Sequence, residues 1–166
     1  MDSLVVWFTD TFNGTISPEV AIFVISLMPI LELRGGLLAA KLLAVPILTA
    51  IPICIIGNIL PIPFILLLIK KVLNWMKKVK GLRKIAVWLE EKAQKRSDKV
   101  AAAEFWGLVF FVGIPIPGTG AWTGSLIAAL LGIDFKKAIL AELLGVAIAT
   151  VIMSIVSYGL LGVFIG

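Results

Sequence analysis

Two ionisable residues surrounded by apolar sequence are the first candidates for chemistry. Glu32 and Arg34 lie within residues 29–36, between apolar stretches at residues 18–28 and 37–45. An ionisable side chain in such surroundings is costly, which favours a role in binding, gating or ion transfer. The alternative is a structural ion pair in which the two side chains neutralise each other.

A second cluster, residues 115–124, has no charge but many hydrogen-bonding groups. Thr119, Thr123 and the Trp122 indole lie among glycines, whose amides would be free if a helix is interrupted there. Free amides at a helix start bind anions, and an arginine facing them would complete an anion or phosphate cradle. The alternative is that the glycines only allow close helix packing.

We therefore expect a substrate- or ion-binding site where the two clusters meet. Glu142, in the last apolar segment, suits a proton or cation carrier and should lie within reach of this site. Its alternative role is a carboxyl tied to the backbone or to Arg34. The residues expected to line or serve the site are Glu32, Arg34, Pro117, Thr119, Trp122, Thr123, Glu142 and Asn58.

Other kinds of site lack the residues they need. The chain has no histidine, and its single cysteine, Cys54, lies in an apolar run. No nucleophile motif, phosphate-binding loop or close pair of acids on one helix is present. We expect no metal, no cofactor, no disulfide framework and no enzymatic activity.

The composition indicates an all-α integral membrane protein of the cell membrane. The 166 residues are 60% hydrophobic, with a mean hydropathy of +1.10. Soluble domains are about 45–50% apolar, and so short a chain cannot hide the excess in a water-soluble core. The excess apolar surface is expected to face lipid.

The elements that would position the site fall into short and long apolar segments. Residues 46–69 carry no charge and form the best spanning helix, which Pro52, Pro61 and Pro63 should kink. Residues 18–45 and 105–133 each hold two short apolar arms around a Pro/Gly-rich centre, which is typical of re-entrant helical hairpins. Kinked spanning helices are the alternative for both.

The two halves of the chain resemble each other. A shift of 88 residues aligns Pro29 with Pro117, Gly36 with Gly124, and further positions such as Gly57 with Gly145. We interpret residues 18–69 and 105–166 as two repeats, each a hairpin followed by a spanning helix. The first repeat is expected to start with Ser17 as a helix cap and Pro18 in the first turn. The second spanning helix is expected to start after Asp134 as its cap.

A basic connector joins the repeats at residues 70–104. It holds eleven of the 15 Lys and Arg residues and has apolar positions at helical spacing. This predicts an amphipathic helix on the cytoplasmic membrane surface, in a multi-pass protein. A nucleic-acid partner, the other meaning of a basic run, is not expected between two membrane-embedded halves. With the connector inside, the two repeats have opposite orientation, which is an inverted repeat.

The two motifs also resemble a known family. PILELRGG at residues 29–36 and PIPGTGAWTG at residues 115–124 are similar to the prokaryotic putative small multi-drug export proteins, over nearly the whole chain. That resemblance implies export. The paired hairpins also resemble DedA-type proteins, which implies lipid-phosphate transport or lipid scrambling. Glu32 matches their acidic first hairpin, but the second hairpin here has no arginine.

Three functions follow as expectations. The first is a small secondary transporter that exports small molecules with ion or proton coupling. The second is a DedA-like lipid translocase or scramblase, and the third is a non-transporting membrane scaffold. The partners expected are a small-molecule or lipid substrate, membrane lipids and a second copy of the chain, because a homodimer would shield hairpin backbone from lipid.

Overall fold

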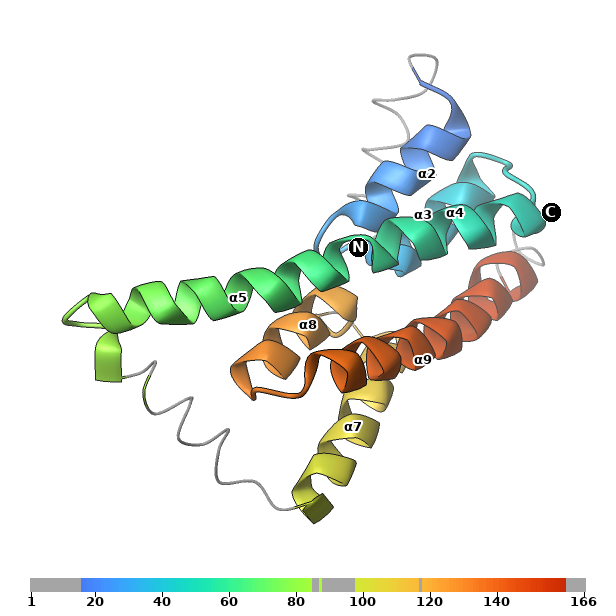
Figure 1. The fold of residues 1–166 in the computed structure, drawn as a ribbon. Helices are drawn as coiled ribbons and strands as arrows, with labels where there is room; N and C mark the ends of the chain where they lie inside the picture. The colour runs from blue at the N-terminus through green and yellow to red at the C-terminus, as the bar shows by residue number, and fades with distance from the viewer. Residues whose placement is uncertain (1–15, 85–86, 88–97, 117, 161–166) are drawn as a thin grey trace.

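The computed structural model describes residues 16–84, 87, 98–116 and 118–160, and this described part is helical with connecting turns. The helices follow one another in the order shown in Figure 1. They are α2 (Pro18–Leu27), α3 (Glu32–Leu42), α4 (Ile47–Ile59), α5 (Pro61–Lys78), α7 (Asp98–Gly113), α8 (Ala121–Leu130), α9 (Phe135–Ser154) and the π-helical continuation η1 (Ile155–Leu160).

Two helix starts agree with the caps expected from the sequence. Ser17 caps α2, where its Oγ accepts a hydrogen bond from the Val20 amide at 3.4 Å, and Pro18 occupies the first helical turn. Asp134 caps α9, where its Oδ1 accepts hydrogen bonds from the amides of Lys136 and Lys137 at 3.1 and 3.3 Å. The final long helix therefore begins where the sequence indicated.

The first helix break is shorter than expected. It covers residues 28–31, and α3 already begins at Glu32, whose amide donates to the Met28 carbonyl at 3.1 Å. Arg34 and the following glycines are thus helical, which corrects the expectation that they lie at a non-helical tip. The break stays short because only Pro29 lacks an amide hydrogen, and because Ile30 takes a positive φ of 80° to turn the chain.

Residues 46–78 form a longer helical run than predicted. The run Ile47–Leu68 is long and apolar enough to cross a membrane, and so is Phe135–Gly159. Pro52 lies inside α4 as expected, but Pro61 is the first residue of α5, where a missing amide hydrogen costs least.

The connector is not one helix of its own. Its first residues continue α5 as far as Lys78, and its last residues, from Asp98 onward, belong to α7. The backbone is extended at Val79, which ends α5. The prediction of a single amphipathic helix over residues 70–104 is therefore wrong at both ends, and residues 85–86 and 88–97 lie outside the described part.

The helices pack in two groups, which meet where α5 packs on α8 and where α3 and α4 pack on α9 (Figure 1). In the first group α2 packs along α3 and α4, and in the second α7 packs along α9. Glycines set the closest approaches: a Cβ on Gly57 would lie 2.8 Å from the Phe23 carbonyl oxygen, and one on Gly145 would lie 2.9 Å from that of Val109. Small residues at helix crossings let backbones come this close.

Large apolar side chains cover much of the outer surface. Leu48, Phe64 and Val151, on the two long apolar helices, are 84%, 68% and 61% exposed. Exposed apolar surface of this extent marks contact with lipid or with another protein. It agrees with the membrane location predicted from composition.

Candidate functional site

Glu32 caps a helix in the other half of the chain. It is the first residue of α3, only 3% exposed, and its carboxylate faces the first turn of α8. Its Oε2 accepts a hydrogen bond from the Ala121 amide at 3.1 Å, and its Oε1 accepts one from the Trp122 amide at 3.0 Å. The first amides of a helix have no partner within it, and they carry partial positive charge, so a carboxylate stabilises them.

Glycine at position 120 makes room for this contact. Gly120 precedes α8 with a φ of 139°, and it provides no side-chain cap of its own. A Cβ on Gly120 would lie 1.8 Å from the Glu32 Oε2. Only glycine therefore fits here, for both conformational and steric reasons.

Arg34 binds the chain between α7 and α8. Its guanidinium donates to the Ile116 carbonyl, to the carbonyls of Val112 and Ile114 at 3.3 and 3.2 Å, and to Thr119 Oγ1 at 3.0 Å. Carbonyls at a helix end and in the segment after it lack intrahelical partners. Arginine suits them because it offers five donors in a fixed geometry.

Thr119 and Trp122 complete the contacts between the two breaks. The Thr119 hydroxyl lies 2.9 Å from the Ile114 carbonyl oxygen and 2.8 Å from that of Ile116, and it donates to one of them. The Trp122 indole donates to the Leu27 carbonyl at the end of α2, at 3.1 Å. Each half thus supplies partners for backbone groups that the break in the other half leaves free.

These contacts change two sequence-based interpretations. Glu32 and Arg34 direct their hydrogen bonds to the second half instead of closing the first hairpin on themselves. The amides at the start of α8 do form an anion cradle, but the chain's own carboxylate fills it. Arg34 also supplies the basic group that the second cluster lacks in sequence.

Glu142 lies next to the same turn of α8. It is fully buried on α9, and its Oε2 accepts a hydrogen bond from the Ser125 hydroxyl at 2.9 Å. Its Oε1 has no hydrogen-bond partner among the described residues, and a Cβ on Gly124 would lie 3.9 Å from it. The first two turns of α8 therefore contact both buried acids, and Glu142 is held by Ser125 instead of the backbone or Arg34.

The remaining predicted site residues are less closely tied to this cluster. Thr123 is half-buried on the first turn of α8. Asn58 is buried on α4, and its Oδ1 has no hydrogen-bond partner within the described part of the chain. Pro117 lies outside the described residues.

Sequence reasoning missed several members of the cluster. Ser125 and Gly120 were not singled out, nor were the backbone groups of residues 112, 114, 116, 121 and 122 that bind the two charges. The signal for the backbone groups was present, because a helix break at Pro115 must leave carbonyls before it and amides after it. The sequence did not show which residues of the first half lie opposite these backbone groups.

A cavity of about 300 Å³ lies at the opposite end of α8. It is lined by Leu66, Ala129, Gly132, Ile133, Asp134 and Phe135. Ala129 is eight residues along α8 from Ala121, or about 12 Å at the helical rise. This cavity is therefore separate from the cluster around Glu32.

Comparison with known proteins identifies the class. Residues 32–152 match the model of the family described as "Putative small multi-drug export protein". The match covers most of the chain and includes α3, α8 and most of α9, which carry the cluster. The chain belongs to this family. No curated protein and no solved structure matches it.

Removal of either charge should destabilise the fold, and removal of Arg34 should do so more. Arg34→Ala leaves Glu32 without its neighbouring cation and removes every hydrogen bond that the guanidinium donates to the second half, which should cost about 3–5 kcal/mol. Glu32→Gln places an amide NH₂ opposite one of two backbone amides, which should cost about 1–3 kcal/mol. Unfolding in lipid–detergent micelles measures both. Thr119→Val is the milder control, and equal stability of Arg34→Ala and wild type would contradict the contacts of Arg34.

Proposed function

We propose that the chain is a secondary transporter that exports small molecules through a site between its two helix breaks. One observation carries the proposal: two buried charges of α3 bind the backbone on both sides of the break before α8. Broken helices at membrane depth occur where protein or a polar cavity shields them, and in transporters they form the substrate site. The description of the family, which names export, supports the direction that we propose.

The packing of α2 and α3 supports a re-entrant hairpin in the first half. α2 has ten residues and α3 has eleven, which gives each a length of about 15–17 Å against a hydrocarbon thickness of about 30 Å. The two helices also pack along each other. The arms of one kinked spanning helix would instead lie end to end. In the second half α7 packs mainly along α9, so the hairpin interpretation there rests on the short apolar lengths of Ala103–Gly113 and Ala121–Leu130 and on the resemblance between the repeats.

Matching contacts support an inverted repeat. Gly36 and Gly124, which the 88-residue shift aligns, both lie on the helix after a break and both contact the following long helix. A Cβ on Gly36 would lie 2.9 Å from Cys54 Sγ, and one on Gly124 would lie 3.9 Å from Glu142 Oε1. The same shift aligns Cys54 with Glu142. The two repeats would therefore pack their helices in the same way. At the position of Cys54 in the first repeat, the second repeat has the acid Glu142.

The mechanism follows from what holds the cluster closed. Protonation of Glu32 would remove the charge that binds the Ala121 and Trp122 amides and would free the start of α8 for a polar group of the substrate. Glu142, with one carboxylate oxygen unpartnered among the described residues, would carry the second proton or a cation. Opposite movement of the two halves around these groups would give alternating access.

Lipid translocation is the second candidate. The observation in its favour is that Arg34 reaches the second break, which places a basic group where a lipid phosphate could bind. Each of its hydrogen bonds to residues 112–119 would then have to be exchanged for the phosphate. A scaffold, the third possibility, would use Glu32 as a helix cap but would have no need of Glu142, whose Oε1 has no hydrogen-bond partner among the described residues.

Transport should depend on both acids. In proteoliposomes, a proton gradient should drive accumulation of a lipophilic cationic dye or of a compound chosen by thermal stabilisation from a ligand panel. Glu32→Gln and Glu142→Gln should each reduce this transport at least tenfold, because neither amide can carry a proton. Glu19→Gln is the control, since Glu19 lies exposed at the start of α2.

Other outcomes would favour the alternatives. Movement of fluorescent phospholipid between leaflets without a gradient, at a rate the acid variants reduce, would indicate a scramblase. Absence of gradient-driven dye transport by the wild type would contradict the transporter proposal and favour a scaffold. Full dye export by both acid variants would contradict the role given to the two acids.

We propose that the segment after α5 faces the cytoplasm, because the basic residues concentrate there. With Cys54 replaced by Ala, a cysteine at the exposed position Lys84 should react with an impermeant maleimide only after cells are permeabilised. Labelling of intact cells would show the opposite orientation.

We also propose that the chain forms a homodimer. A fully active species in lipid with the mass of one chain would contradict this.

A further inference from the structure

One exposed stripe of α5 changes from apolar to basic along its length. Phe64, Leu67, Lys71, Asn74 and Lys78 are all exposed and recur at three- and four-residue steps. At 3.6 residues per turn they fall within an arc of about 80° on one face of the helix. The stripe is therefore amphiphilic from end to end, with its apolar part on the spanning run Ile47–Leu68 and its basic part beyond it.

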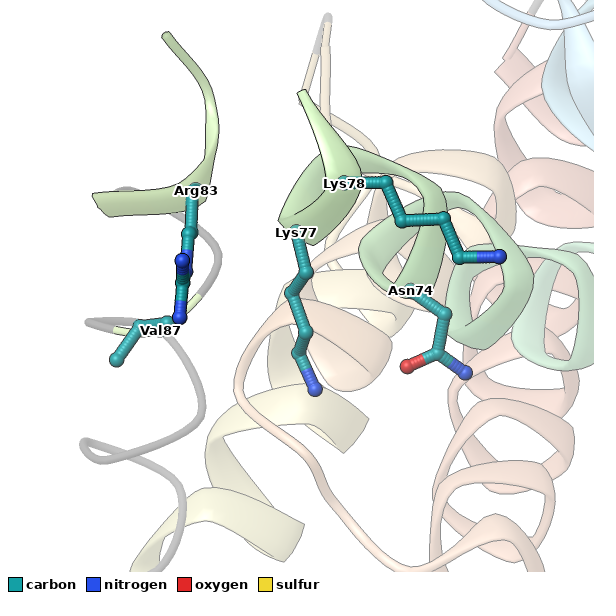
Figure 2. Close-up of a pocket in the computed structure, with 5 residues that line it drawn as sticks. All are labelled: Asn74, Lys77, Lys78, Arg83 and Val87. Atoms are coloured by element: carbon teal, nitrogen blue, oxygen red, sulfur yellow. The ribbon is translucent and has the colours of Figure 1, made fainter. Parts of the chain in front are cut away.

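The basic end of the stripe opens into a cavity. This cavity has a volume of about 640 Å³ and is lined by Asn74, Lys77, Lys78, Arg83 and Val87. Figure 2 shows Asn74, Lys77 and Lys78 on the last turns of α5, with Arg83 and Val87 on the segment after the turn. Three cationic side chains and one amide thus surround a space next to the end of a spanning helix.

We propose that this cavity binds the headgroup of an anionic phospholipid whose acyl chain lies along Phe64 and Leu67. Phe64 and Lys78 are fourteen residues apart, which is about 21 Å along the helix. This is half of the roughly 40–45 Å thickness of a bilayer with its headgroups. The stripe therefore has the length and the polarity of one lipid molecule.

Two further features favour a lipid over a soluble anion. Trp75, 59% exposed, lies beside Asn74 on α5, and tryptophan concentrates at the level of the headgroups. Basic side chains near a spanning segment attract anionic lipid, and their long apolar stems can lie against its upper chain. A soluble phosphate would use the cavity but not the apolar half of the stripe. The proposal does not depend on what the protein transports.

Binding of defined lipids to the purified full chain tests the proposal. Native mass spectrometry and thermal stability should both show retention of dioleoyl phosphatidylglycerol in preference to dioleoyl phosphatidylcholine. Lys78→Gln combined with Arg83→Gln should weaken phosphatidylglycerol binding about tenfold or more, because two charges facing one headgroup are lost. Leu67→Ser should weaken it as well, by about threefold, because the acyl contact is lost.

Matched variants separate a built site from general attraction. Lys136→Gln combined with Lys137→Gln removes the same charge at the exposed start of α9, and Leu48→Ser removes an exposed apolar side chain of α4. Both controls should leave lipid binding within twofold of wild type. The proposal would be overturned if the Lys136/Lys137 double variant lost as much lipid binding as the Lys78/Arg83 double variant. It would also be overturned if the protein bound both lipids equally, or if soluble glycerol phosphate stabilised it as much as phosphatidylglycerol does. Melting of every variant without lipid confirms that it is folded.

Discussion

Backbone groups at a helix break inside an apolar layer have no water to bind, and each one left without a partner costs several kcal/mol. Among the described residues, the breaks between α2 and α3 and between α7 and α8 leave such groups, and the packing of the two halves depends on how they are satisfied. Glu32 binds the free amides after the second break, and Arg34 donates to the carbonyls of Val112 and Ile114 where α7 ends. The Trp122 indole binds a carbonyl before the first break. The two halves of the chain therefore complete each other.

In the proposed transporter, this reciprocal contact would join stability to function. A transporter must open a path to its site, and here opening would require groups to leave partners that an apolar environment cannot replace. A substrate, a proton or a lipid headgroup would have to supply the missing interaction at the moment of opening. This exchange of hydrogen-bond partners would couple opening of the site to binding, because the contact between the halves is released only when another partner is present. Gly120 allows Glu32 to approach α8, and Gly124, on the first turn of α8, allows Val112 of α7 to pack closely against it.

Local sequence signals predicted the elements better than their contacts. The caps Ser17 and Asp134 were readable because a capping side chain acts on its own neighbours. α3 starts before the apolar stretch expected at residues 37–45, because Gly36 lies inside the helix, where it allows close packing against Ser26. The extent of α5 was missed because charge was taken to end the helix, whereas lysine is a good helix former. The meeting of the two clusters was anticipated, but the acceptors of Arg34 depend on the register between halves, which no local pattern contains.

A double-mutant cycle between Glu32→Gln and Gly120→Ala tests the contact between the two halves most directly. Both changes act on the same contact, because a Cβ at position 120 would displace the Glu32 carboxylate. Free energies of unfolding in lipid–detergent micelles, measured for the wild type, both single variants and the double variant, give the coupling energy. The contact predicts that the double variant loses at least about 1 kcal/mol less than the sum of the single losses. Additive losses would show that Glu32 does not cap α8, and would contradict the account.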